Sequence, residues 1–218
     1  MPRHYDLIAF DWDGTLYDST AFITRAIQSA CRDVGLPVPS TQRASYVIGL
    51  GLQDALMHAA PELPAHRYPE LARAYQRHYR AGRDELLLFD GVLPMLRALK
   101  ERNHCVCVAT GKSRRGLDET LAAVELAGLF DGTRTADETA PKPDPTMLVE
   151  LMTEFGTTPQ RTLMIGDTTH DLQMARSAGV ACVGVSYGAH PYADFDPYAP
   201  RFVAHSTVEL HDWLIAHG

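Results

Sequence analysis

Short apolar runs alternate with segments of helical periodicity along most of the chain. The runs are bounded by turn residues and lie within 6–11, 104–111, 161–167 and 179–188. Between them, apolar residues recur at a helical period, for example over 147–155. Buried strands that alternate with amphipathic helices indicate a parallel sheet covered on both faces. We therefore predict an α/β fold with a doubly wound parallel sheet, a Rossmann-like core, in which residues 133–137 add a short fifth strand.

A stretch of about 70 residues after the first run breaks this alternation. Its apolar spacing predicts one helix after residues 18–20 and a second over 67–81, with no strong strand between them. So many helical residues are too long for a single crossover connection. We therefore predict an α-helical cap domain inserted after the first strand, with hinges near Tyr17 and Leu87. The predicted domains are an α/β core, 1–17 and 88–218, and the cap, 18–87.

The composition narrows the classes of function. Of 218 residues, 45% are hydrophobic and 22% are charged, which is ordinary for a soluble globular protein. A formal net charge of −7 argues against nucleic acid as a partner, because non-specific binding to it needs a positive surface. The first apolar run has only four residues and no later run approaches a membrane span. We therefore expect no membrane partner and a cytoplasmic location, with monomer and homodimer both open.

The four cysteines do not add a further function to this prediction. They lack the CxxC spacing of a metal or redox site. Cys105 and Cys107 alternate inside one apolar run, so we interpret them as buried thiols of a strand and expect no zinc.

Polar residues gather where the strong strand candidates end. The first run leads into 11–15, the second into 110–113 and the third into 166–168. In a doubly wound sheet the carboxyl ends of the strands converge on the crevice where ligands bind. Lys142 stands in a loop between the second and third of these strands, restricted by a proline on either side. The sequence therefore predicts that aspartates, hydroxyls and lysine meet in one crevice.

This set of side chains points to a particular chemistry. Several carboxylates in one crevice would repel each other unless a cation were present, and oxygen ligands suit Mg²⁺. Thr110 and the backbone amide of Gly111, at an expected helix start, suit an anion. Lys142 would neutralise charge on a phosphate and on a nearby aspartate. Metal, phosphate site and carboxylates together indicate phosphoryl transfer.

Four motifs occur in this order along the chain: DWDGTLYDS, VATGK, PKPDP and MIGDTTHD. In these motifs the chain resembles the haloacid dehalogenase-like hydrolase superfamily, and within it the phosphoglycolate phosphatase-like branch that carries a helical cap. The resemblance covers essentially the whole chain. It implies that Asp11 attacks phosphorus to form an aspartyl-phosphate. It also implies that Asp13 protonates the leaving alkoxide and then activates water.

The resemblance implies the remaining roles as well. Asp11, the backbone carbonyl of Asp13, and Asp167 would hold Mg²⁺, and Asp171 would act from behind these ligands or through a water. The implied phosphate-binding groups are Thr110, the amide of Gly111 and Lys142. The implied substrate is a small phosphorylated metabolite, with 2-phosphoglycolate the best-known example in the family. The expected activity is that of a phosphatase, a phosphoric monoester hydrolase.

Other functions stay open at this point. A phosphomutase, a pyrophosphatase or a nucleotidase would use the same residues. A phospho-accepting regulatory domain also combines aspartate, magnesium and lysine, but it would have neither the Asp13 acid nor a 70-residue cap. An acid at position 13 favours phosphatases and phosphomutases over dehalogenating members of the superfamily.

Several side chains have no settled role in the sequence. Lys112 is either a surface residue at a helix start or a substrate contact. Gly49 and Gly51 lie either in a loop that faces the active site or in a turn between helices. His170 is expected to be exposed. A group of cap arginines either draws in phosphate esters or forms a solvated face: Arg67, Arg73, Arg77, Arg80 and Arg83.

Overall fold

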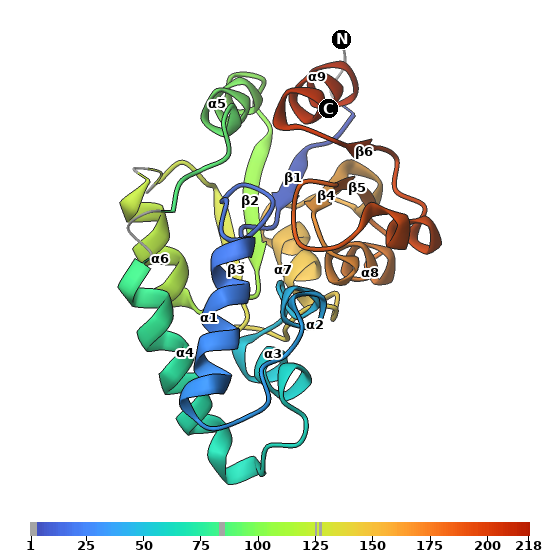
Figure 1. Cartoon of the computed structure of the whole chain (residues 1–218). Coiled ribbons are helices and arrows are strands. Elements are labelled where there is room, and N and C mark those ends of the chain that lie inside the picture. Colours follow the sequence, from blue (N-terminus) through green and yellow to red (C-terminus); the bar gives the residue numbers. More distant parts are fainter. Residues whose placement is uncertain (1–3, 83–85, 125, 127) are drawn as a thin grey trace.

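The computed structural model describes residues 4–82, 86–124, 126 and 128–218. A parallel sheet of six strands forms its centre, in the order β3-β2-β1-β4-β5-β6 (Figure 1). The strands are β1 (Leu7–Phe10), β2 (Cys105–Thr110), β3 (Gly132–Thr135), β4 (Thr162–Gly166), β5 (Ala181–Val185) and β6 (Val203–Ala204). The predicted fold class is confirmed. The expected short fifth strand is β3, and the two-residue β6 was not predicted because it is too short to show any periodicity.

Helices cover both faces of the sheet, which explains why the strands are almost wholly apolar. Within β1, Ile8 and Phe10 pack on one face, whereas Leu7 and Ala9 pack on the other. The first face is covered by α5 (Val92–Glu101), α6 (Arg114–Ala123) and α9 (Thr207–His217). The second face is covered by α7 (Thr146–Glu154) and α8 (Thr169–Ser177). Central strands therefore have no solvated side, as expected for a parallel sheet.

The chain leaves β1 into a helical unit that lies below the sheet in Figure 1. Its helices are α1 (Thr20–Asp33), α2 (Thr41–Tyr46), α3 (Leu52–Ala59) and α4 (Tyr68–Gly82), with a short 3-10 helix, Ala65–Arg67. These helices share a hydrophobic cluster of their own. An inserted helical cap is thus present, and its domain bounds of 18–87 stay a prediction. The two predicted cap helices correspond to α1 and α4, while the shorter α2 and α3 were not resolved by the sequence pattern.

The two connections between core and cap run side by side. The backbone N–H of Asp18 donates to the carbonyl of Leu87 at 2.9 Å, and Tyr17 forms a bridge with Leu88. The predicted hinge positions, Tyr17 and Leu87, therefore lie at one crossing point, which a hinge between two domains requires; their hinge role stays a prediction. Over the described ranges, every helix is too short or too polar to span a bilayer.

Candidate active site

Asp11 and Lys142 form the centre of the crevice at the carboxyl ends of β1 and β4. The N–H of Asp11 donates to the carbonyl of Ile165, so Asp11 continues the ladder beyond β1. Lys142 enters from the loop before α7, and its Nζ lies 2.5 Å from Oδ1 of Asp11 and 2.6 Å from Oδ1 of Asp171. All three side chains are buried. The lysine therefore neutralises two carboxylates in a dry site, as a buried charge requires.

Asp167 and Asp171 flank this centre from the end of β4 and the start of α8. Asp171 completes a capping box, because its Oδ2 accepts hydrogen bonds from the N–H and the hydroxyl of Thr168. Asp167 accepts from the hydroxyl of Thr15 at 2.9 Å and from the N–H of Ala189 at 2.7 Å. Oδ2 of Asp171 therefore accepts two hydrogen bonds and its Oδ1 pairs with Lys142, whereas each oxygen of Asp167 accepts one hydrogen bond and keeps room for a further ligand.

The three carboxylates can converge on one cation. One oxygen each from Asp11, Asp167 and Asp171 lies within 4.8 Å of the others. Oδ2 of Asp11 is buried and has no hydrogen-bond partner among the residues that the structure describes. A buried carboxylate oxygen without a partner is costly and calls for a ligand. The oxygen donors and this orphaned atom fit a hard cation such as Mg²⁺.

The pKa values of the crevice residues reflect the same crowding of carboxylates. Burial raises the pKa of Asp11 to about 7, with Lys142 opposing the shift and Asp171 adding to it. Burial also raises the pKa of Asp167 well above its ordinary value, and the neighbouring Asp11 and Asp171 add to the effect. For Lys142, burial alone would lower the pKa, but the two carboxylates outweigh it and raise the value. The site holds more negative charge than one lysine balances.

Asp13 lies on the cap side of this crevice. Its Oδ1 accepts from the hydroxyl of Ser19 at 2.6 Å, and its Oδ2 lies 3.0 Å from Nζ of Lys112. Lys112 also donates to the hydroxyl of Tyr79 in α4, at 2.9 Å. Burial would lower the pKa of Lys112, but Asp13, Tyr79 and Tyr75 together outweigh burial and raise that pKa. Asp13 is therefore linked through Lys112 to a helix of the cap.

Lys112, Ser19 and Tyr79 were not identified as site residues from the sequence. Lys112 was left between two interpretations, and the structure places it in a buried ion pair. Ser19 stands at the expected N-cap of α1, but its side chain bonds Asp13 instead of capping the helix. The only signal for Ser19 was its place in the DWDGTLYDS motif, and Tyr79 gave none.

Thr110 and Gly111 lie at the end of β2, as predicted. The hydroxyl of Thr110 accepts from the N–H of Lys112 at 3.2 Å. A Cβ at Gly111 would collide with the carbonyl oxygens of Gly49 and Leu50 in the cap. Glycine is therefore needed at position 111 because the cap loop approaches the backbone there, and Gly49 does lie in a loop that faces the site.

The expectation that His170 is exposed is wrong, because its side chain is buried. Its Nε2 lies 2.9 Å from the backbone carbonyl of Tyr46, and Nε2 of His190 approaches the same oxygen at 2.9 Å. The Tyr46 ring stacks on His190 with centroids 4.8 Å apart. Burial lowers the pKa of both histidines. Sequence reasoning failed here because the cover comes from a cap residue 124 positions away.

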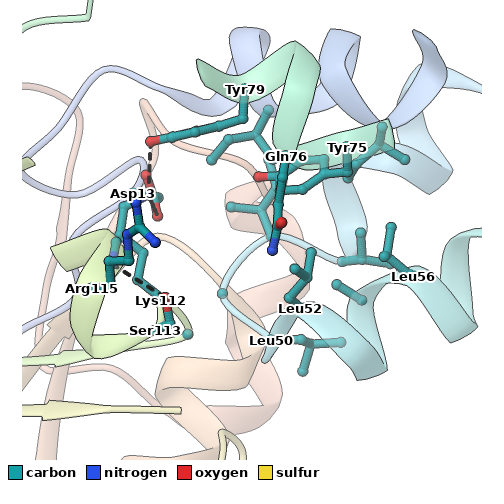
Figure 2. A pocket seen from close by; sticks show the side chains of 18 of the residues that line it. Asp13, Leu50, Leu52, Leu56, Tyr75, Gln76, Tyr79, Lys112, Ser113 and Arg115 are labelled. Carbon is teal, nitrogen blue, oxygen red and sulfur yellow. Dashed lines mark hydrogen bonds and ion pairs between the residues drawn. The ribbon is translucent and has the colours of Figure 1, made fainter. Parts of the chain in front are cut away.

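A cavity of about 320 Å³ opens beside Asp13, between the cap and the loop after β2 (Figure 2). Among the cap arginines, Arg80 lines it. Arg67 instead pairs with Glu70, and Arg77 lies 3.5 Å from Asp33 on an exposed surface. These two arginines belong to a solvated face, while Arg83 lies outside the described residues.

A parallel α/β core with an aspartate-rich crevice under a helical cap defines a class of capped α/β enzymes. Within that class, the chain belongs to the haloacid dehalogenase-like hydrolase family, whose sequence model matches residues 8–185. The family expected from the four motifs is therefore confirmed, and with it the expectation that the protein is an enzyme, a hydrolase.

Known proteins similar to this chain carry related names. A probable phosphatase IndB from Dickeya dadantii is 34% identical over 94% of this chain and 91% of its own length. A 5'-nucleotidase from Pseudomonas aeruginosa is 32% identical over 98% of this chain and 97% of its own. A predicted phosphoglycolate phosphatase from Haemophilus somnus, of known structure, has a TM-score of 0.83 at 27% identity, covering 97% of this chain and 99% of that one.

Proposed function

We propose that the protein is a magnesium-dependent phosphatase that hydrolyses a small phosphate monoester through an aspartyl-phosphate on Asp11. The observation that carries this proposal is the state of the Asp11 carboxylate. Lys142 holds one oxygen at 2.5 Å, while the other is buried and without a hydrogen-bond partner among the described residues. Membership of the family and the names of the similar proteins support the same reaction.

In the proposed first step, a carboxylate oxygen of Asp11 bonds to phosphorus as the bond to the leaving oxygen breaks. Asp13, whose side chain lies on the cap side of the crevice, gives its proton to the departing alkoxide. In the second step Asp13 takes a proton from water, and the resulting hydroxide attacks phosphorus. The acyl phosphate bond breaks, phosphate leaves and Asp11 is restored. Splitting the reaction in two replaces one difficult displacement with two easier ones.

The remaining residues would hold the phosphoryl group and the cation. Thr110, the amide of Gly111 and Lys142 are the proposed partners of the phosphoryl oxygens. Asp11, Asp167 and the Asp13 carbonyl would hold Mg²⁺, which supplies a positive charge against the phosphate when bound.

Asp171 would act indirectly. Its oxygens already accept from Lys142 and from Thr168. It therefore fixes the lysine that neutralises Asp11, and we assign it to positioning rather than to direct ligation.

The alternative enzyme classes are a phosphomutase, or a pyrophosphatase or nucleotidase of the same fold. For a phosphatase, 2-phosphoglycolate is a candidate substrate. The 5'-nucleotidase among the similar proteins supports the nucleotidase alternative. A phospho-accepting regulatory domain would keep its aspartyl-phosphate for hours, whereas an enzyme turns it over rapidly. We further propose that the protein acts on a phosphorylated metabolite in the cytoplasm, as a monomer or homodimer.

The test is a phosphate-release screen over phosphorylated metabolites, with and without Mg²⁺. We expect release to depend on Mg²⁺ and to be lost in Asp11→Asn. Asp118→Asn, an exposed carboxylate on α6, is the matched control and should behave like the parent. Equal release by Asp11→Asn and the parent would overturn the proposed mechanism.

A further inference from the structure

We infer that the leaving alcohol of the substrate is uncharged and largely apolar, and that it binds in the cavity beside Asp13. This inference rests on the proposed phosphatase function and narrows it to a class of substrate. Asp13 lines the cavity, and Asp13 is the proposed donor of a proton to the leaving oxygen. Because the leaving oxygen must lie near that carboxyl, the rest of the alcohol extends into the cavity.

The cavity wall away from Asp13 is apolar. Figure 2 shows aliphatic side chains of the cap, among them Leu50, Leu52 and Leu56, gathered on this wall. Further apolar lining comes from α1 and from the segment after α2: Ile23, Ile27, Val47 and Ile48. Such a wall stabilises a ligand by removing apolar area from water, at roughly 25 cal/mol per Å². It offers nothing to a carboxylate or a second phosphate.

The charges around the cavity are mostly neutralised within the protein. Lys112 pairs with Asp13 at 3.0 Å, and Arg115 pairs with Glu119 at 2.9 Å. The leaving group of 2-phosphoglycolate carries a carboxylate, which would need an available cation in this place. Arg80, an exposed residue at the lining, is the group such a carboxylate would use. Among the described residues of the lining, this leaves Arg80 as a candidate anion contact against a wall of aliphatic carbon.

Neutral polar groups complete the lining. Gln76 extends from α4 into the cavity, and Tyr75 lies next to it (Figure 2). Burial raises the pKa of Tyr75, so its hydroxyl stays protonated and can donate a hydrogen bond. A volume of about 320 Å³ lies at the lower end for small-molecule sites. The chemistry therefore fits an apolar chain or ring with one or two neutral polar atoms, as in an alkyl or aryl alcohol.

The first experiment compares primary alkyl phosphates from ethyl to hexyl, whose leaving oxygens are alike in basicity. We expect kcat/KM to rise by about fourfold for each methylene that enters the cavity. Butyl phosphate should be a better substrate than 2-phosphoglycolate. Nucleoside 5'-monophosphates are tested separately, and a higher kcat/KM for them than for hexyl phosphate would overturn the inference of an apolar leaving group.

The second experiment changes the wall. Leu52→Gln keeps the size of the side chain but makes it polar, so the ratio of kcat/KM for hexyl phosphate to that for acetyl phosphate should fall about tenfold. Met57→Gln is the matched control, since Met57 lies on the same helix but is exposed and does not line the cavity. Its ratio should equal that of the parent. As a readout independent of any variant, inhibition constants of alkylphosphonates should fall with chain length.

The outcomes separate this inference from the proposed function. Asp11-dependent release from acetyl phosphate tests the phosphatase itself. If that release occurs but the alkyl series and the phosphonate series are both flat, the inference is overturned while the phosphatase stands. It is also overturned if 2-phosphoglycolate is the best substrate and Arg80→Gln removes that preference.

Discussion

Lys112 and Asp13 form an ion pair of 3.0 Å in which each side chain is only 10% exposed. The lysine comes from the core loop after β2, and its second partner, Tyr79, comes from the cap. The acid proposed to protonate the leaving group is therefore in direct contact with a residue that touches both domains. A single ammonium group thus connects Asp13 to α4 of the cap.

The ion pair can be tested by a double-mutant cycle. Lys112→Met leaves the buried carboxylate of Asp13 without its cation, so it should cost more stability alone than in combination with Asp13→Asn. We expect a coupling free energy of about 1–3 kcal/mol from urea unfolding of the four proteins. Additive effects of the two substitutions would contradict a direct pair.

Lys142 should be the more sensitive lysine. It lies fully buried between Asp11 and Asp171, and Lys142→Met would leave those carboxylates facing each other. We expect a loss of about 3–5 kcal/mol in the free energy of unfolding. Lys100→Met breaks the partly exposed pair with Asp131 and should cost about 1 kcal/mol or less. Similar losses in the free energy of unfolding of both variants would contradict a larger contribution from the buried Lys142 ion pairs.

Removal of divalent cation should lower stability as well as activity. If Mg²⁺ binds the folded crevice at 100 times its dissociation constant, it stabilises the protein by about 2.7 kcal/mol. Thermal unfolding in EDTA and in Mg²⁺ should differ accordingly for the parent. Asp167→Asn should shrink that difference, while the exposed Asp118→Asn should leave it intact. An equal Mg²⁺ shift in both variants would exclude Asp167 as a ligand.

Gly111→Ala should disturb the contact between cap and core without changing a charged group. Its added Cβ would meet the carbonyl oxygens of Gly49 and Leu50, which are backbone atoms and cannot rotate away. We expect kcat/KM to fall by about 10²-fold, as for a small misplacement of reacting groups. Gly51→Ala is the control from the cap segment that Gly111 faces, because its Cβ would make ordinary contacts of 3.4 and 3.5 Å. Comparable losses of kcat/KM in both variants would contradict a special role for the close contact at Gly111.

The sequence predicted the fold because the periodicities of strands and helices are local patterns, and the same patterns placed the candidate site residues at the strand ends. Asp11 and Asp167 each follow a buried strand and Thr110 ends one, and parallel strands bring such positions to one edge. The same logic could not show that His170 is covered, because its cover is Tyr46 of the cap. The two interpretations of Lys112 stayed open for a related reason, since its partner in α4 is 33 residues away and follows no shared period. Contacts across the two domains depend on how they dock, which short-range patterns do not encode.

The buried lysine at position 142 joins parts of the chain that are distant in sequence. Its two carboxylate partners stand 131 and 29 residues away, one on the first strand and one on the helix after the fourth. A nascent or truncated chain that lacks its last third therefore has an aspartate at position 11 but no balanced reactive centre. The balance of charge around Asp11 therefore depends on a contact that only a nearly complete chain can make.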